Sequence, residues 1–401
     1  MYAKSISMLF YLFFTCVIFN PQISGVTIYL YTFLPFLDPG FCRFLLATSR
    51  RWLIPIAIAM AACLLTNPVM AAKIVSIFAC VGYLMYTISK RIDYLHPWMM
   101  INIVFGLAQF VLYYADYSLS VAMGPDQVSK MLWGDSATQT NANYYAILYF
   151  ARVSGFSREA GFFSSLLSAA FVLYLFQGRR NRWIIAMYCI GLFISLSKAS
   201  FVLLIFAALY GMRRQLRALL PLFSLAAFFV VTMVLALYMS AHNFFGSETF
   251  AHRFAGYPFL IDASFADLVR GVTSQQLNDE YGYLPYLASN RDLYAISSVT
   301  FTGIPGLFAD VGLLGALVVL GVFAFTASDG FVILLCLLIT TTVGLTTVTS
   351  FVPIAYLIAY WPSFARYLRA QRERATAPAH GRVIARPRPA RTAVPARPAL
   401  R

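Results

Sequence analysis

The sequence has few charged residues, because Asp, Glu, Lys and Arg make up only 11% of its 401 positions. An ordinary soluble domain has about 25%, so the composition excludes a soluble globular protein. Acidic residues are the scarcest, with 15 Asp and Glu against 30 Lys and Arg. The formal net charge of +15 is typical either of a nucleic-acid-binding protein or of a membrane protein with basic cytoplasmic loops.

Cysteine and histidine are also rare, with 6 and 4 residues respectively. All the cysteines lie in or beside apolar segments, which argues against a disulfide framework. The histidines show no metal-ligand spacing of the H-E-x-x-H or C-x-x-C kind. Neither a P-loop nor a G-x-G-x-x-G sequence occurs, so neither a metal nor a cofactor is expected.

Hydrophobic residues are in excess, at 60%, and a membrane-spanning helix needs about 20 residues of this kind. The first apolar segment lacks a small-residue cleavage site after it, so we interpret it as a retained helix. The sequence therefore predicts an all-α, multi-pass integral membrane protein with about twelve transmembrane helices. The expected spans are 6–19, 24–37, 52–66, 72–89, 97–115, 159–177, 183–197, 199–212, 218–240, 304–326, 331–349 and 351–365.

Basic and acidic residues separate between the two sides of this predicted topology. With the N-terminus in the cytoplasm, twenty-two of the 30 Lys and Arg lie inside and eleven of the 15 Asp and Glu lie outside, as the positive-inside rule predicts. The net charge therefore reports orientation, and no nucleic-acid partner is expected. The cations left outside are Lys73, Lys130, Arg152, Arg158, Lys198, Arg253, Arg270 and Arg291.

Two segments need separate interpretation. The run 183–212 fits either one long tilted helix or two short helices that turn at 195–200, and we prefer the hairpin because it keeps both flanking basic clusters inside. Residues 366–401 are rich in Pro, Arg and Ala and cannot bury a core. We therefore divide the chain into a membrane domain, 1–365, and a disordered cytoplasmic tail, 366–401, which is attracted to anionic lipid.

Most of the polar chemistry falls in two expected outer loops, 116–158 and 241–303, the second with a short amphipathic helix at 259–269. The first loop leads into R-V-S-G-F-S-R-E-A-G at 152–161, which contains two cations and a carboxylate at the start of a helix. Because a guanidinium matches phosphate oxygens, Arg152 and Arg158 are candidates for binding a phosphate-bearing lipid. Glu159 would orient an arginine or accept a proton, and its alternative role is to complement the helix dipole.

Three further groups are candidates. Lys198 lies among serines at the outer turn of 183–212, and an ionisable residue close to a bilayer is a functional candidate. His252 and Arg253 lie near the start of the long outer loop, where a histidine is more often a bystander. Residues 303–315 read G-I-P-G-L-F-A-D-V-G-L-L-G and lead the chain back into the membrane, and the alternative role of their glycines is helix packing.

These motifs, in this order, resemble the O-antigen and exopolysaccharide polymerase (Wzy) family, within a wider group that includes the O-antigen ligases. The matching sequences are R-x-S-G-x-x-x-E-x-G at 152–161, S-x-S-cation at 195–198, Arg253, and A-D-V-G-L-L-G at 309–315. The resemblance covers roughly residues 140 to 325. The group usually has Arg where Lys198 stands. The ligase branch carries a His-Asn pair that residues 297–302 lack, which favours a polymerase over a ligase.

The resemblance implies a metal-independent glycosyltransferase at the outer face of a bacterial inner membrane. The distribution of charge predicts that both termini are cytoplasmic. Its substrate would be an undecaprenyl-diphosphate-linked oligosaccharide, and further partners would be membrane lipid and the chain-length regulator and flippase of the same pathway. The diphosphate would be bound by Arg152, Arg158, Lys198 and Arg253. Glu159, or else His252, would take the proton of the attacking hydroxyl.

Three other classes of function stay open. A lipid-linked oligosaccharide flippase or other transporter would also have about twelve spans, although it would be expected to show an internal repeat, and none is found. An O-antigen ligase and a structural subunit of an assembly complex are the remaining alternatives.

Overall fold

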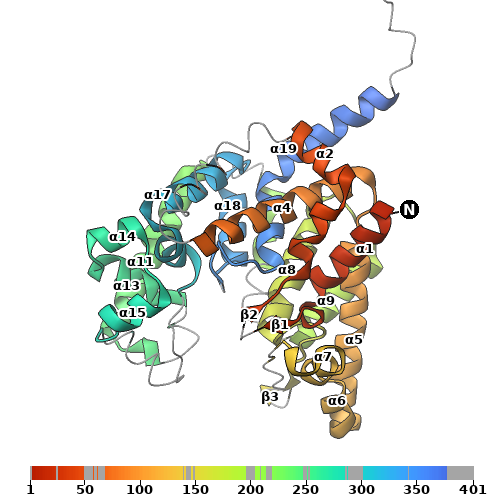
Figure 1. The fold of residues 1–401 in the computed structure, drawn as a ribbon, viewed down its shortest axis with the longest axis horizontal. Helices are drawn as coiled ribbons and strands as arrows, with labels where there is room; N and C mark the ends of the chain where they lie inside the picture. The colour runs from red at the N-terminus through yellow and green to blue at the C-terminus, as the bar shows by residue number, and fades with distance from the viewer. Residues whose placement is uncertain are drawn as a thin grey trace, which may run out of the picture.

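The computed structural model is mostly helical, with two short β-hairpins (Figure 1). It describes residues 2–23, 26–48, 57, 61, 68–138, 140, 146–147, 150–195, 204–207, 209–213, 219–246, 251, 253–284, 287, 301–341 and 343–376. Figure 1 shows a bundle of longer helices and, beside it, a smaller group of short helices.

Four helices of the described chain are long and apolar enough to cross a membrane: α4 (Pro68–Lys90), α5 (Leu95–Ala115), α11 (Pro221–Ala241) and α17 (Gly303–Thr326). At 1.5 Å per residue each is about 31–36 Å long, which matches a hydrocarbon core of about 30 Å. The prediction of a helical membrane protein is confirmed at this level. The number of twelve spans stays a prediction.

Several other expected spans are helices of smaller length. These are α1 (Tyr2–Thr15), α8 (Ala160–Phe176) and α9 (Arg182–Ser195), which at 14 to 17 residues reach only about 21–26 Å. The last helix, α19 (Phe351–Thr376), continues past residue 365, where the tail was expected to begin. Residues 377–401, and 52–66 apart from 57 and 61, lie outside the described residues.

The expected span 24–37 is not a helix. A hairpin of β1 (Gln22–Ile23) and β2 (Val26–Thr27) leads into two 3-10 turns, η2 (Leu30–Thr32) and η3 (Leu34–Leu37). The reason is local, because the β-branched residues at 26–28 favour extended backbone and Pro35 cannot donate a backbone hydrogen bond. Hydropathy alone does not distinguish this segment from a helix.

The expected span 331–349 is helical only in its first half. Helix α18 (Gly330–Ile339) ends there, and the chain reaches α19 through 340–350, a segment that reads T-T-T-V-G-L-T-T-V-T-S and whose described residues are mostly buried. Its hydroxyls compete for backbone groups, since Thr340 donates to the carbonyls of Cys336 and Leu337. We call 340–350 the threonine segment.

Shorter elements complete the connections. They are η1 (Val17–Phe19), α2 (Pro39–Thr48), α6 (Tyr117–Ala122), α7 (Pro125–Trp133), η4 (Gly134–Ser136), β3 (Ala146–Ile147), β4 (Phe150–Ala151), η5 (Tyr210–Met212) and η6 (Phe244–Gly246).

Ion pairs mark one end of the bundle, which we call the ion-paired end. Arg179, after α8, lies 3.7 Å from Asp93, which stands before α5. Arg213 lies 3.1 Å from Asp329, which precedes α18. All four residues belong to connections that the sequence places on the same, inner side.

The described parts of 183–212 agree with the hairpin interpretation. The ring of Tyr210 stacks on Phe176 at 4.0 Å between centroids, so the chain returns to the end of the bundle at which α9 begins. A single straight helix would have carried Tyr210 to the opposite end.

The opposite end, which we call the loop end, joins two connections that the sequence places outside and the threonine segment, which the sequence places in the outer half of the span 331–349. Trp133 donates to the carbonyl of Phe19 at 3.1 Å, and Ile18 donates its backbone N–H to Phe156 at 3.2 Å. Tyr31 donates to the carbonyl of Val348 in the threonine segment at 2.7 Å. Residues 16–23, the loop before α8 and the threonine segment therefore meet at one place.

The described residues of the expected loop 241–303 form a small helical unit, which we call the cap. It contains α13 (Gly256–Asp262), α14 (Phe265–Arg270) and α15 (Ser274–Tyr281), so the predicted helix at 259–269 is present but divided. The cap has its own apolar core, in which Phe259 packs against Tyr281 and Phe301 at centroid distances of 5.1 and 5.0 Å.

The cap docks on a break in α17. Gly312 interrupts the helix with φ 68° and ψ 177°, a conformation that glycine tolerates and other residues rarely adopt. A Cβ at this position would lie 2.3 Å from the carbonyl oxygen of Val269. The backbone of Val272 donates to Ala309 across the same contact at 2.7 Å, so the break is where α14 meets α17.

Candidate functional site

The R-x-S-G motif forms a loop that two buried amides of α5 hold in place. Asn102 accepts from the N–H of Phe156 at 2.8 Å, and Gln109 accepts from the N–H of Gly155 at 3.0 Å. Asn102 also donates to the carbonyl of Thr15 at the end of α1. Because these amides are fully buried and their bonds are directional, they fix the backbone just before Arg158.

The loop can approach α5 this closely because residue 155 is glycine. Its φ is 55°, and a Cβ there would lie 2.2 Å from Oδ1 of Asn102. The next residue, Phe156, stacks on Phe105 at 3.8 Å between centroids. The glycine of the motif therefore serves the close approach, and the phenylalanine anchors the turn.

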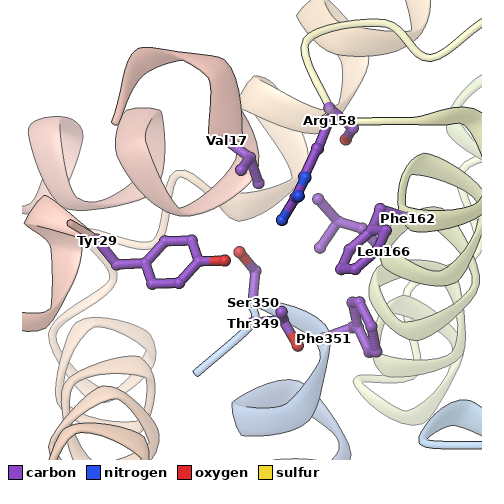
Figure 2. Close-up of a pocket in the computed structure, with 9 residues that line it drawn as sticks. Val17, Tyr29, Arg158, Phe162, Leu166, Thr349, Ser350 and Phe351 are labelled. Atoms are coloured by element: carbon purple, nitrogen blue, oxygen red, sulfur yellow. The ribbon is translucent and has the colours of Figure 1, made fainter. Parts of the chain in front are cut away.

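Arg158 points into a pocket at the loop end (Figure 2). Three parts of the chain meet there: Val17 and Tyr29, the start of α8, and the junction of the threonine segment with α19. The empty space is about 320 Å³ when its mouth, which is open to solvent, is included. Its enclosed part has room for roughly one water molecule. The lining residues are Val17, Tyr29, Ser157, Arg158, Phe162, Leu166, Thr349, Ser350 and Phe351.

Polar groups of this pocket lack hydrogen-bond or ion-pair partners among the described residues. The hydroxyls of Ser157 and Thr349 are buried and have no hydrogen-bond partner among the described residues. Within the same part of the chain no carboxylate forms an ion pair with Arg158. Leaving buried polar groups unbonded is costly, so a cation and two free hydroxyls in one pocket are chemically suited to an anion with several acceptor oxygens.

Glu159 lies directly beside Arg158 but outside the pocket lining. It occupies the N-cap position of α8, and its side chain makes no capping hydrogen bond. Its carboxylate forms no ion pair with any described residue. The carboxylate is therefore free to accept a proton or hydrogen bond next to the pocket.

Arg152 contacts the end of α9 and does not line the pocket. Its Nε donates to the carbonyl of Ser195 at 3.4 Å, and Val153 donates to Ile194. The guanidinium thus sits at the carboxyl end of α9, where a cation complements the helix dipole. This contact brings the first motif next to the start of the S-x-S-cation motif.

Arg253 is not among the residues that line the pocket. Arg253 lies in the cap, and burial lowers the pKa of its guanidinium. Among the described residues it has no ion pair. Lys198 and His252 lie outside the described residues.

Sequence reasoning missed the residues that complete the site, Thr349 and Ser350 of the threonine segment and Tyr29. The signal was a hydroxyl-rich run at the end of an apolar segment, because such residues favour irregular backbone over helix. Asn102 and Gln109 were missed as well. Both are amides in an otherwise apolar span, where polar residues are rare and usually bonded.

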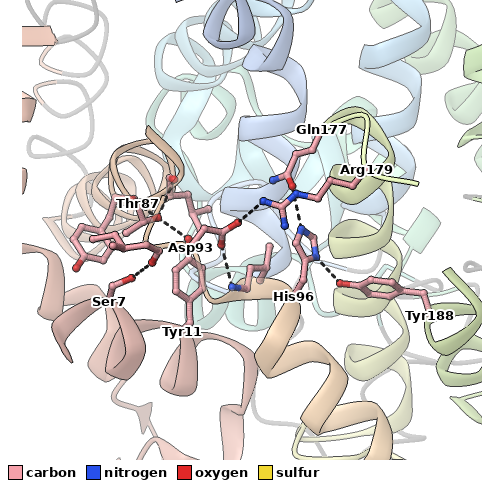
Figure 3. Close-up of polar contacts among 12 residues, drawn as sticks. Ser7, Tyr11, Thr87, Asp93, His96, Gln177, Arg179 and Tyr188 are labelled. Atoms are coloured by element: carbon pink, nitrogen blue, oxygen red, sulfur yellow. Dashed lines mark hydrogen bonds and ion pairs between the residues drawn. The ribbon is translucent and has the colours of Figure 1, made fainter. Parts of the chain in front are cut away.

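A second polar cluster lies at the ion-paired end (Figure 3). His96 is buried, with Nδ1 2.8 Å from the hydroxyl of Tyr188 and Nε2 3.2 Å from Oε1 of Gln177. As assigned, the amide oxygen accepts, so Nε2 carries the proton and Nδ1 accepts from Tyr188. Beside it, Asp93 accepts from the backbone of Leu95.

The described residues contain no group of three or more His, Cys, Asp or Glu that could hold a metal ion.

Comparison with known proteins gives no relative: no family model, no curated protein and no solved structure matches this chain.

Proposed function

We propose that this chain is a polysaccharide polymerase, a glycosyltransferase that joins oligosaccharide repeat units carried on undecaprenyl diphosphate at the outer face of a bacterial inner membrane. The observation that carries the proposal is the pocket, where Arg158 has no ion pair and the hydroxyls of Ser157 and Thr349 have no hydrogen-bond partner among the described residues. A diphosphate supplies the acceptor oxygens that these groups need. Because the enclosed space is small, it receives one phosphate edge rather than the whole group.

The reaction is a displacement at the anomeric carbon next to the diphosphate. A hydroxyl of the incoming repeat unit attacks that carbon, and the bond to the phosphate oxygen breaks with its electron pair leaving on the lipid diphosphate. Arg158 stabilises the negative charge that develops there. Glu159, adjacent and unpaired, accepts the hydroxyl proton.

The arrangement of the two ends supports the proposed orientation. Two ion pairs join connections with predicted cytoplasmic locations, while the motif loop, the pocket and the cap belong to segments with predicted outer locations. With the ion-paired end in the cytoplasm, the pocket faces the leaflet from which an outer-face polymerase takes its substrate. A cytoplasmic location of both termini is part of this proposal.

Two experiments test the function. In-frame deletion is expected to abolish long-chain glycan while single repeat units are still made and exported. Purified protein in nanodiscs, given lipid-linked repeat extracted from that deletion strain, is expected to form a ladder of longer glycans on electrophoresis. Protein denatured before addition is the control.

Other results assign other functions. Movement of the lipid-linked repeat across a vesicle membrane without a ladder indicates a transporter, and transfer to a lipid A core acceptor indicates a ligase. Unchanged polymer length in the deletion strain, or no reaction of the purified protein, contradicts the polymerase.

A further inference from the structure

The cap contacts both of the long apolar helices that flank it in the chain, α11 and α17, well inside their cap-side ends (Figure 1). Tyr257 of α13 packs against Phe229 of α11, with ring centroids 5.9 Å apart. Phe229 lies twelve residues before the end of α11 at Ala241, which is about 18 Å along the helix axis. Because α11 is long and apolar enough to cross a membrane, this ring of the cap reaches the part of α11 that lies inside the bilayer.

The contact with α17 is also below the cap-side end of that helix. The carbonyl oxygen of Val269, in α14, would lie 2.3 Å from a Cβ at Gly312, so the two backbones touch. Gly312 follows the start of α17 at Gly303 by nine residues, about 14 Å. A helix about 36 Å long extends only about 3 Å beyond each side of a hydrocarbon core of about 30 Å. Helix α14 therefore meets α17 roughly 10 Å below the membrane boundary, a depth at which interfacial helices lie.

Large apolar side chains are exposed on this part of the cap. Ile261 at the end of α13 is 59% exposed, and Phe265 and Val269 of α14 are 75% and 42% exposed. Phe265 and Val269 are four residues apart and share one face of α14. Asp267 lies on the opposite face, where it accepts a hydrogen bond from Tyr281 of α15. We call Ile261, Phe265 and Val269 the α14 patch.

The other side of the cap is polar. Helix α15 reads S-Q-Q-L-N-D-E-Y, and its exposed residues include Gln275, Gln276, Asp279 and Glu280. Its apolar Leu277 is buried in the core of the cap. One apolar side and one strongly polar side are typical of a structure that lies at a membrane boundary.

The surface beside the patch is apolar as well. Leu314 and Leu317 follow the break in α17 and are 58% and 56% exposed, as expected for a membrane-spanning helix that faces lipid. Because α14 packs on that break, the α14 patch continues this lipid-facing surface. Exposed apolar patches on a protein commonly mark a contact with a membrane or with another protein, and the depth of α14 favours the membrane.

We propose that the α14 patch inserts among the acyl chains of the leaflet on the cap side, so that α13 and α14 are immersed in the membrane while α15 faces water. The segment between α11 and α17 then contains a part embedded in lipid and is not a wholly aqueous loop. This proposal does not depend on the polymerase function.

Quenching of tryptophan by brominated lipid tests the contact directly, since bromine atoms on the acyl chains quench only a ring that touches them. Phe265→Trp replaces one exposed aromatic ring with another. In nanodiscs of brominated lipid its added emission should fall by about half relative to unbrominated discs, because a patch about 5–10 Å deep lies among the acyl chains. The emission of the wild type, which has five tryptophans, is subtracted in each lipid.

The matched control is Glu280→Trp, on the exposed polar side of α15, whose added emission should be the same in both lipids. Thermal unfolding checks that each variant is folded. If Phe265→Trp is not folded, Ile261→Trp gives the same measurement at a second position of the patch.

Two results overturn the proposal. Equal emission of the patch tryptophan in both lipids would mean that the patch contacts water, a second copy or another part of this chain. Equal quenching of the patch tryptophan and Glu280→Trp would mean that the cap has no separate lipid-facing side.

Discussion

The two ends of the bundle differ in the pairing of one arginine each, Arg179 at the ion-paired end and Arg158 at the loop end. At the ion-paired end, Asp93 lies beside Arg179, and both ring nitrogens of His96 have partners. At the loop end, Arg158 has no ion pair with any described residue. Unbonded buried groups occur at both ends, among them the hydroxyls of Ser157 and Thr349 in the pocket and the amide nitrogen of Gln177 beside His96. Charges that are paired inside the chain stabilise the fold, whereas charges left unpaired at structural cost are available to a ligand.

The difference does not come from the types of residue, because arginine, hydroxyl and amide groups occur at both ends. It comes from which segments of the chain the fold brings together at each end. Helix termini with complementary charges meet at the ion-paired end. At the loop end a cation from the motif loop lies in a pocket lined by hydroxyl, aromatic and aliphatic side chains, with no carboxylate among them. The comparison therefore predicts that activity and stability respond to different arginines.

Arg158→Ala and Arg179→Ala test this directly. Arg158→Ala should lower the rate of polymer formation about 10²- to 10³-fold, as removal of one charge-stabilising donor does, with the unfolding temperature unchanged. Arg179→Ala leaves the carboxylate of Asp93, whose side chain is only 5% exposed, without its cation, so it should cost about 1–3 kcal/mol of stability while activity at permissive temperature persists. Rates in nanodiscs and thermal unfolding measure both.

Arg158→Lys sharpens the result. It keeps the charge but loses the planar fork, so activity between those of wild type and Arg158→Ala is expected. Full activity of Arg158→Ala, or equal loss of stability in both alanine variants, would mean that the two ends do not differ in function.

The next largest effect is expected where the cap contacts α17. Gly312→Ala should introduce about 1–3 kcal/mol of strain, because the residue has a positive φ and the new Cβ meets the carbonyl of Val269. The matched control is Gly321→Ala in the same helix, where a Cβ meets nothing within 4 Å. Hydrogen exchange of residues 256–281 should rise in Gly312→Ala and stay unchanged in Gly321→Ala. Equal exchange in the two variants would contradict docking at the break.

The sequence predicted the long helices well because length and apolarity alone define them. Helices α4, α5, α11 and α17 fall on the expected segments 72–89, 97–115, 218–240 and 304–326. It failed at 24–37 and 340–350, where β-branched residues, proline and hydroxyls decide the backbone while hydropathy stays high. The average hydrophobicity of a segment does not show whether such residues disrupt its helical backbone.

The sequence predicted only part of the site. Contacts between residues far apart in the sequence could not be predicted. The motif around Arg158 was visible because its residues are adjacent. That Thr349 completes the same pocket depends on the threonine segment leaving the helix and returning to residues 16–23 and 29. Nothing near Arg158 in the sequence indicates that contact.

At the ion-paired end, Tyr188→Phe tests whether bonding there is structural. It leaves Nδ1 of the buried His96 without its donor, so it should cost about 1 kcal/mol of stability and leave polymer formation unchanged. Tyr283→Phe, an exposed tyrosine of the cap, is the control for loss of a hydroxyl. A fall in polymerisation with an unchanged unfolding temperature would mean that His96 has a role in the reaction and not only in stability.

The smallest effect concerns the pH response of the cap, where Asp267 differs from the unbonded groups of the pocket. Its carboxylate accepts hydrogen bonds from Tyr281 and Ser264, and these lower its pKa below the usual range. A lowered pKa in the folded state contributes stability that is present above the unfolded value of about 3.9 and is lost as the pH falls through the folded value. Asp267→Asn should abolish this acid dependence in the hydrogen exchange of 264–281, while the exposed Asp279→Asn should retain it. The same acid dependence in both variants would mean that other carboxylates cause it. Asp267 would then not be an example of a charged group whose hydrogen bonds stabilise the fold.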